Sequence, residues 1–377
     1  MPHYKLQPVK SEARIAYVVD TLPSIGGGEK VLFAALEAHP HADVFTLVYN
    51  KKVFANTPIA NRKIRTSFLN ALPFAHKHHR FFLPLMPAAI EQFDLRAYDL
   101  IVSFNYAVAN GVQKINGARH VSYTHTPLRY AWTDININGT YSRRNPILET
   151  YMQKFREWDQ RAASRVHAIA TNSQAVSKRI RFAYERDAPV IYPPVEVERF
   201  KPNNHRENYF VTIARLVPHK RIDLLIQAFN QLNLPLIVIG DGPELPRLKK
   251  IAHPNIQFLG FQPDEAVADL LNKARAFVSA AEEDFGIAIV EAQAAGCPVI
   301  TLGQGGALET VIDGVTGVLF SEQSVPCIIE AVMKFEREQE SFQVDELMKS
   351  AKRFDKQRFL REFTEFAQLA PSESHKR

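Results

Sequence analysis

Short apolar segments alternate along this chain with segments in which apolar residues recur at helical spacing. In the first half the apolar segments cover 14–20, 43–49, 99–105, 119–125, 167–173 and 189–192. Strands that alternate with helices in this way usually pair in parallel, and the helices cover both faces of the sheet. The pattern therefore predicts a doubly wound α/β domain in the first half of the chain.

A second series of the same kind follows an interruption at 192–204, where prolines and polar residues replace the apolar pattern. Its apolar segments cover 209–214, 234–240, 255–261, 275–280 and 298–301. In open sheets of this type, ligands bind beyond the carboxyl ends of the strands. Two such domains with facing edges would enclose a central cleft.

The domain boundaries follow from this alternation. We predict an N-terminal domain over 1–192, a linker over 193–207 and a C-terminal domain over 208–355. The tail over 356–377 begins as a helical segment of mixed charge, and we expect it to pack back on the N-terminal domain.

The composition is that of an ordinary soluble globular protein, with 46% hydrophobic and 23% charged residues among 377. Cys297 and Cys327 have no paired spacing, so we expect neither a disulfide framework nor a zinc cluster. Residues 1–13 lack the apolar core of a signal peptide, and no apolar run approaches the ~18 residues needed to cross a bilayer. We therefore expect a reduced, cytoplasmic protein.

The net charge is +6, from 46 basic and 40 acidic residues, and this excess favours anionic partners. The stretch 62–82 interleaves Arg, Lys and His with Phe and Leu. Such a stretch suits the surface of an anionic membrane, single-stranded nucleic acid, or an ordinary packed segment with solvated charges. Of the two partners we expect peripheral membrane contact and no nucleic acid.

Two glutamates, Glu283 and Glu291, bracket a turn between a predicted strand and a predicted helix. Both carboxylates can reach one polyhydroxylated ligand whose anionic part rests on the amides of Phe285 and Gly286. Acidic residues also favour a helix N-terminus without any ligand, which is a sufficient reason for 282–284. Glu291 lies too far inside the helix for that explanation.

Cations and glycines follow other strands of the same predicted domain. Arg215 comes directly after the strand at 209–214, and Lys220 precedes a helix whose dipole disfavours a cation unless an anion is bound. Gly240 and Gly242 follow another strand and lead into a helix. Surface turns often carry lysines, and glycines there can serve the backbone alone. The combination nevertheless indicates an anion site at this edge of the sheet.

The first strand of the chain is joined to its helix by three glycines, Gly26–Gly28. They form neither a Walker loop nor a Gly-x-Gly-x-x-Gly motif, which argues against a P-loop NTPase and a plain dinucleotide enzyme. His125 ends another strand of this half, where an imidazole can bind a sugar or its acceptor, or only cap local backbone.

These motifs closely resemble those of the retaining glycosyltransferases of family 4, which have the GT-B architecture. The likeness is carried by ARLVPHKRIDLLIQAF at 214–229, by VIGDGPE at 238–244 and by the Glu-x7-Glu segment that begins at Glu283. It covers about 210–320 strongly and the first half only faintly. It implies an α/β fold of two facing, Rossmann-like, doubly wound domains with a central cleft.

The resemblance also implies roles for the residues already named. Arg215 and Lys220 would hold the donor diphosphate, and Glu291 would accept the ribose hydroxyls. His125 and Glu283 are the candidate catalytic residues, in contact with the reacting sugar. The full set implied for donor binding is Gly27, Gly28, Arg215, Lys220, Gly240, Gly242, Asp284, Phe285, Gly286, Ile287 and Glu291. Asp284 is a departure, because many members have Gly at that position.

Two short segments, 124–132 and 281–287, look most like the bacterial enzymes that mannosylate lipid-linked oligosaccharides from GDP-mannose in polysaccharide assembly. This likeness implies a retaining α-mannosyl transfer to a saccharide linked to polyprenyl diphosphate. The cytoplasmic face of the inner membrane is the location that such an acceptor suggests.

No cofactor and no metal site are expected, since the motifs contain no metal-ligand set and the nucleotide sugar is itself a substrate. Three alternatives remain open: a glycosyltransferase that uses a UDP-sugar, a nucleotide-sugar epimerase of related fold, and a catalytically silent nucleotide-sugar-binding protein.

Overall fold

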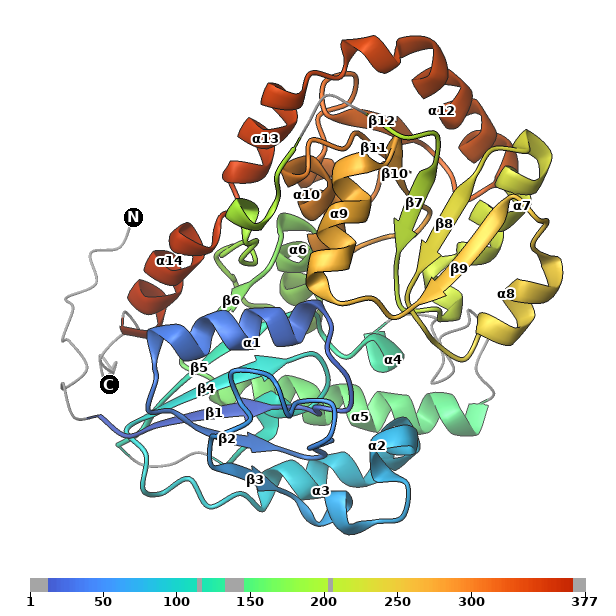
Figure 1. Cartoon of the computed structure of the whole chain (residues 1–377). Helices are drawn as coiled ribbons and strands as arrows, with labels where there is room; N and C mark the ends of the chain where they lie inside the picture. Colours follow the sequence, from blue (N-terminus) through green and yellow to red (C-terminus); the bar gives the residue numbers. More distant parts are fainter. Residues whose placement is uncertain (1–12, 114–116, 133–145, 203–205, 369–377) are drawn as a thin grey trace. The chain divides into compact units, whose positions relative to one another are not determined.

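The computed structural model describes residues 13–113, 117–132, 146–202 and 206–368. The described chain forms two compact units, each built on its own six-stranded sheet (Figure 1). One unit contains the described residues up to Pro194 together with those from Gln357 onward. The other contains the described part of Val195–Lys356.

The sheet of the first unit is parallel throughout, in the order β3-β2-β1-β4-β5-β6. Its strands are β1 (Ile15–Val19), β2 (Asp43–Thr46), β3 (Ile64–Thr66), β4 (Leu100–Asn105), β5 (Arg119–Thr124) and β6 (Ala168–Thr171). Its α-helices are α1 (Gly27–Ala38), α2 (Ala75–His78), α3 (Met86–Glu91), α4 (Arg129–Trp132), α5 (Pro146–Arg165), α6 (Gln174–Tyr184) and α14 (Lys356–Gln368). The strand order reverses between β1 and β4.

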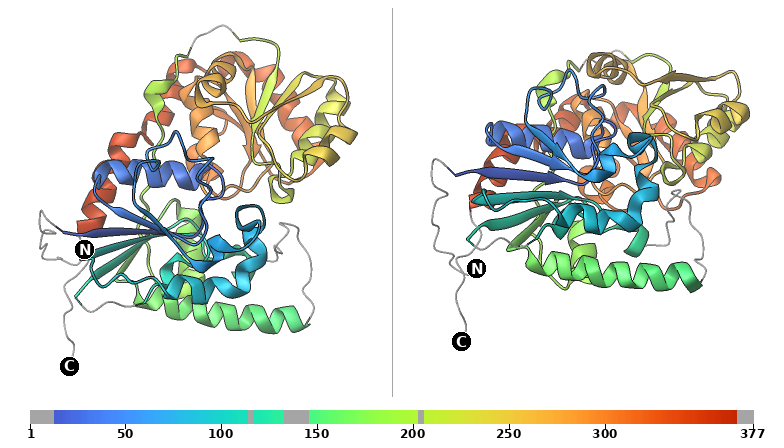
Figure 2. Two further views of the ribbon diagram at one scale, coloured as in Figure 1. Left: turned by 60° about the horizontal axis from the view of Figure 1, so that its bottom comes forward. Right: turned by 90° about the horizontal axis from the view of Figure 1, so that it is seen from below.

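Helices cover both faces of this sheet, with α1 on one side and α5 on the other (Figure 2). Alternate strand residues point to opposite faces because the side-chain period of a strand is two. Ala16 and Val18 pack with α3 and α5, whereas Tyr17 and Val19 pack with α1 and α14. The central strand β4 is buried at every position, as an apolar run inside a parallel sheet should be.

Helix α14 completes the core of the first unit from the far end of the chain. Phe359, Phe363 and Phe366 recur at helical spacing, so they share one face. The ring of Phe363 is fully buried, and its centroid lies 6.4 Å from that of Tyr17 and 5.9 Å from that of Phe104. Aromatic packing therefore holds one face of the helix, and Arg358 on its polar side adds a hydrogen bond to the carbonyl of Tyr192 at 2.7 Å.

The second unit has a parallel sheet in the order β12-β11-β10-β7-β8-β9. Its strands are β7 (Phe210–Ile213), β8 (Leu236–Ile239), β9 (Ile256–Gly260), β10 (Ala276–Ser279), β11 (Val299–Leu302) and β12 (Gly317–Phe320). Its α-helices are α7 (Ile222–Leu232), α8 (Leu245–Ile251), α9 (Asp264–Lys273), α10 (Ile287–Ala294), α11 (Ala307–Thr310), α12 (Val325–Glu338) and α13 (Val344–Lys352). The two sheets confirm the predicted fold class, a doubly wound parallel α/β arrangement.

Three strands differ from the prediction. The predicted strand at 189–192 is reduced to a single bridge between Val190 and Thr171, because Pro189 and the prolines that follow limit ladder pairing. The edge strands β3 and β12 were not predicted. Residues Arg65 and Thr66 of β3 are exposed and polar, so this strand has no apolar run to reveal it.

Candidate functional site

The loops after β7 and β10 leave the second sheet side by side, because these two strands are paired neighbours. Strands β8 and β9 continue the sheet on one side of this pair, and β11 and β12 continue it on the other. Such a reversal of strand order is where open α/β sheets bind ligands. Arg215 and Lys220 lie in the first loop and Glu283 in the second, so the predicted charged residues flank one switch point.

Lys220 and Glu283 form a two-pronged ion pair across these loops. The ammonium Nζ lies 2.7 Å from each carboxylate oxygen of Glu283. The two side chains are 22% and 21% exposed, so solvent reaches the pair. A partly exposed ammonium can exchange one oxygen anion for another, and the pair can therefore open to a ligand that brings its own negative charge.

The cations at the start of α7 are neutralised within the protein. Lys220 is paired with Glu283, and Arg221 lies 3.5 Å from the carboxylate of Asp223. The sequence predicted that a bound anion would relieve the repulsion between Lys220 and the helix dipole, and in the structure the carboxylate of Glu283 pairs with Lys220. Arg215, just beyond β7, is exposed.

Gly240 and Gly242 allow two loops to lie in direct backbone contact. A Cβ atom on Gly240 would lie 2.0 Å from the carbonyl oxygen of Ala214, and one on Gly242 would lie 2.3 Å from that of Leu216. The Leu216 amide also donates to the carbonyl of Asp241 at 2.9 Å. Any side chain at either glycine would displace the segment that carries Arg215 and leads to Lys220.

The turn between β10 and α10 carries the remaining predicted donor residues. Phe285 is buried and packs edge-on against Phe354, with ring centroids 5.2 Å apart. Gly286 follows with a φ of 89°, and α10 begins at Ile287. Asp284 and Ile287 are half-buried beside it. The Phe285 ring thus anchors the turn between β10 and α10.

Glu291 lies inside α10 and is only 6% exposed. Its Oε1 lies 3.0 Å from Nη2 of Arg199, a residue of the segment predicted as a linker. Arg199 was not predicted from the sequence as a partner of Glu291, because these residues are 92 positions apart. The sequence signal that could have indicated such a partner was Glu291 itself, because a carboxylate inside a buried helix is usually paired with a cation.

The first unit places Gly27, Gly28 and His125 together. The two glycines form the first turn of α1, whose N-cap amide, on Gly26, donates to the carboxylate of Glu29 at 2.8 Å. A Cβ atom on Gly28 would lie 3.6 Å from Nε2 of His125. The imidazole therefore lies against the helix start, at the edge where β1 and β5 end.

Asp20 organises the switch point of the first unit and was also missed. It is fully buried at the end of β1. Its carboxylate accepts hydrogen bonds from the backbone amides of Tyr106, Ala107, Val108 and Ala109. Burial raises the pKa of Asp20 to about 6, although these four hydrogen bonds act in the opposite direction. The carboxylate fixes the loop that follows β4.

A second buried carboxylate, Asp159 of α5, holds helix α4 in place. Its Oδ2 accepts hydrogen bonds from Nε1 of Trp132 at 2.8 Å and from the hydroxyl of Tyr184 at 3.0 Å. Burial raises the pKa of Asp159 to about 7. Trp132 closes the helix that follows the His125 loop, so Asp159 supports that loop indirectly.

Two features are absent from the residues that the structure describes. No group of three or more His, Cys, Asp or Glu side chains is arranged to hold a metal ion among them. None of the helices in the described ranges is long and apolar enough to cross a membrane.

Two family models match the chain, and together they span 25–357. The model described as glycosyl transferases group 1 matches residues 195–357. The model described as glycosyltransferase family 4 matches residues 25–199. The first match nearly coincides with the second compact unit.

Curated relatives and solved structures resemble the chain in different ways. A GDP-mannose-dependent alpha-(1-6)-phosphatidylinositol monomannoside mannosyltransferase of Mycobacterium tuberculosis is 33% identical over 170 residues, in a match that covers 37% of this chain and 44% of that protein. A GDP-mannose-dependent alpha-mannosyltransferase of Corynebacterium glutamicum is 30% identical over 34% of this chain and 32% of its own. The matches thus span less than half the length of these relatives.

The whole described fold recurs in a structure of Anabaena HepE in complex with UDP and glucose. That structure superposes with a TM-score of 0.72 over 94% of this chain and 99% of its own, at 20% identity. At this identity the likeness establishes the fold, which is the GT-B arrangement of two Rossmann-like domains.

Proposed function

The chain is a glycosyltransferase of the group 1 and family 4 type, and from this premise we propose that it transfers an α-mannosyl group from GDP-mannose to a saccharide linked to polyprenyl diphosphate. The transfer would retain the configuration at the anomeric carbon. The donor is supported by the names of two relatives, both of which specify GDP-mannose. The lipid-bound acceptor is supported by the phosphatidylinositol mannoside named for one of them.

The Lys220–Glu283 pair is the observation that carries this proposal. A donor diphosphate would take the place of the Glu283 carboxylate at the Lys220 ammonium, and Arg215 would add a second positive charge. The released carboxylate of Glu283 would accept a hydrogen bond from a hydroxyl of the transferred sugar. Binding of the donor would thus replace one internal ion pair by two charge-assisted contacts.

The same groups would favour departure of GDP. As the bond between the anomeric carbon and the diphosphate oxygen breaks, negative charge grows on the leaving oxygen. Lys220, Arg215 and the amides of Phe285 and Gly286 would meet that charge in fixed positions, so little reorganisation is required. This electrostatic assistance is the reason that the proposal includes no metal and no other cofactor. His125, beside Gly28, is the proposed contribution of the first unit to binding of the reacting sugar.

Membrane contact through the segment 68–85 is part of the same proposal. This segment exposes four apolar side chains next to the cations Lys77 and Arg80. These apolar residues are Phe68, Phe74, Phe81 and Leu85. Phe74 has a φ of 57°, an unfavourable backbone for a bulky residue, with its ring 66% exposed. Exposed rings among cations suit the cytoplasmic face of an anionic inner membrane, where a lipid-linked acceptor would reside.

A thermal-shift screen of nucleotide sugars tests the donor. GDP-mannose at 100 times its dissociation constant should stabilise the chain by ~2.7 kcal/mol, and UDP-glucose, UDP-galactose and GDP-glucose at that concentration should stabilise it less. A larger shift with a UDP-sugar would transfer the donor role to that nucleotide. Chromatography of products with and without a lipid-linked acceptor then separates a transferase from an epimerase, which converts the donor alone, and from a silent binder, which converts nothing.

A further inference from the structure

Arg199 joins two helices of the second unit from the segment that enters it. The residue ends the 3-10 turn Val197–Arg199, close to Val195, where the unit begins. Its Nη2 lies 3.0 Å from Oε1 of Glu291 on α10, and its Nη1 lies 2.7 Å from Oδ2 of Asp264 at the start of α9. The guanidinium carbon also lies 4.7 Å from the ring centre of Phe200. These contacts fix the guanidinium plane.

The two arms of this fork differ in burial. The side chains of Arg199 and Glu291 are 16% and 8% exposed, whereas that of Asp264 is 56% exposed. Solvent screens the Asp264 arm, so the arm to Glu291 is the stronger electrostatic contact. Without the Arg199 guanidinium, the buried carboxylate of Glu291 would lose a charge-assisted contact that holds its position.

We propose that Arg199 is a positioning residue that holds the Glu291 carboxylate in one rotamer, and thereby sets a preference for ribose over deoxyribose in the bound nucleotide. The inference rests on the proposed function and on the role that the family resemblance implies for Glu291, which is to accept hydrogen bonds from the ribose hydroxyls of the donor. A carboxylate already held in one rotamer accepts a hydrogen bond from a hydroxyl without the entropic cost of ordering its side chain. Loss of Arg199 therefore weakens the contact to the ribose hydroxyls and not the contacts to the diphosphate.

The test compares GDP with 2′-deoxy-GDP and 3′-deoxy-GDP by calorimetric titration of the full chain. The wild-type chain should bind GDP about tenfold more tightly than either analogue, and Glu291→Gln should remove that preference. Arg199→Gln should remove it to the same extent, while the affinity for the deoxy analogues changes little. Arg199→Lys should restore part of it, because an ammonium can still pair with Glu291.

Arg275 offers a matched control in the same unit. Its Nη2 lies 2.6 Å from Oε2 of Glu336, and its guanidinium also lies over an aromatic ring, that of Phe210. Arg275→Gln should lower the melting temperature and leave the ribose preference unchanged. A double variant, Arg199→Gln with Glu291→Gln, removes both partners of this ion pair and should bind GDP as weakly as Glu291→Gln alone.

The outcomes separate the possible roles of Arg199. If Arg199→Gln weakens GDP and both deoxy analogues equally, or if the double variant shows additive losses, Arg199 is only a structural support and the inference is overturned. If the wild-type chain binds ribose and deoxyribose nucleotides alike, the role of Glu291 fails and this inference fails with it. If GDP does not bind, but UDP binds more tightly than its deoxy analogues and Arg199→Gln removes that preference, the proposed donor changes. The positioning role of Arg199 is then supported.

Discussion

Lys220 and Glu283 are partners that no local rule of sequence connects, since 63 positions separate them. Each stands at the end of a different strand, and each would be a solvated charge if the strands were not neighbours. The pair is accessible, so it contributes little to stability. In the proposed function this ion pair matters because the donor diphosphate can replace Glu283 at the Lys220 ammonium.

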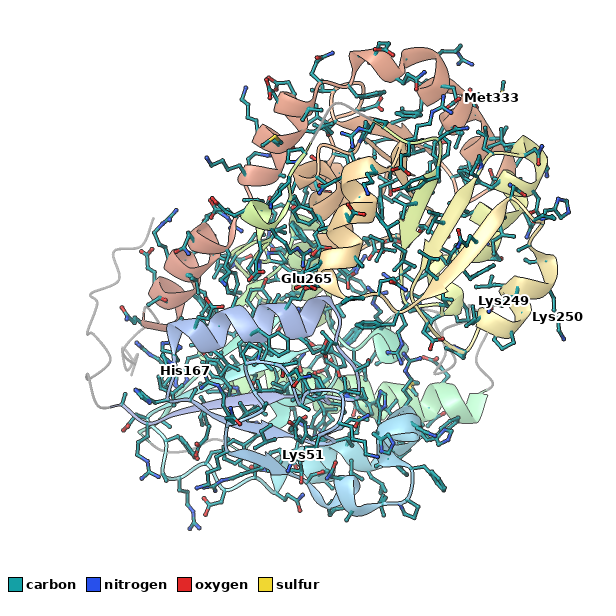
Figure 3. The ribbon with its side chains drawn as sticks, viewed as in Figure 1. Lys51, His167, Lys249, Lys250, Glu265 and Met333 are labelled. Carbon is teal, nitrogen blue, oxygen red and sulfur yellow. The ribbon has the colours of Figure 1, made fainter. Side chains whose placement is uncertain are left out.

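Lys220→Ala should lower kcat/KM for transfer from GDP-mannose by about 10²–10³-fold, because the charge of the leaving diphosphate loses a preorganised partner. The melting temperature should change little. The matched control is Lys249→Ala on α8, an exposed lysine outside the switch point (Figure 3). Near-normal turnover in the Lys220→Ala chain would remove the diphosphate role from this residue.

Asp159 should make the stability of the first unit depend on pH. Burial raises its folded-state pKa to about 7, above the unfolded value near 4, so the folded state binds the proton more tightly. The stabilising contribution is therefore complete below pH ~4 and is lost as the pH rises through ~7. Urea unfolding should show the wild-type chain losing stability relative to Asp159→Asn between these values, by a few kcal/mol at most. Parallel pH profiles for the two chains would contradict this assignment.

Helix α14 shows how an element can be predicted locally while its place in the fold cannot. Its phenylalanine spacing marks one apolar face, and that spacing is local information. The rings that this face meets, Tyr17, Phe104 and Tyr123, come from strands at the other end of the chain. The packing partner is a property of the tertiary fold.

Phe363→Ala should destabilise the first unit by ~3–5 kcal/mol, because it leaves a cavity among fully buried aromatic rings. Urea unfolding followed by circular dichroism measures the loss. Phe182→Ala on α6 is the control, since that ring is 77% exposed and its removal should cost less than ~0.5 kcal/mol. Similar midpoints for the two variants would show that α14 does not stabilise the unit.

The distribution of charge over the whole chain is uneven. Residues 51–90 contain seven Lys and Arg and no Asp or Glu, which leaves 39 basic against 40 acidic residues elsewhere. The net charge of +6 therefore originates in the segment that also exposes Phe74 and Phe81. Phe82, in contrast, packs against the core of the first unit and is not part of this surface.

Replacing Phe74 and Phe81 by Ser should lower the partition coefficient onto vesicles of phosphatidylglycerol and phosphatidylcholine at least tenfold, since two rings no longer leave water. Sedimentation measures the bound fraction, and binding should weaken with added salt. The matched control replaces Phe182 and Phe261, which are 77% and 73% exposed outside this segment. An equal loss of vesicle binding in both double variants would contradict the membrane proposal. Stronger retention of the wild-type chain on single-stranded DNA than on these vesicles would also contradict it.

The alternation of apolar segments was enough to predict the α/β fold class, because strand and helix periods are local properties of a sequence. The same holds for the positions of Arg215, Lys220 and Glu283 in loops after strands. The edge strand β3 escaped prediction, since it has no apolar run and obtains its pairing from β2.

Pairing between distant residues was decided by the tertiary structure alone. Strand order makes β7 and β10 neighbours and so joins Lys220 to Glu283, and the first turn after Val195 carries Arg199 to Glu291. Gly242 could be named as a turn residue, but only the fold shows that its missing side chain makes room for the Leu216 carbonyl. A local pattern states what a residue can do, and the packing of strands far apart in sequence determines which partner it meets.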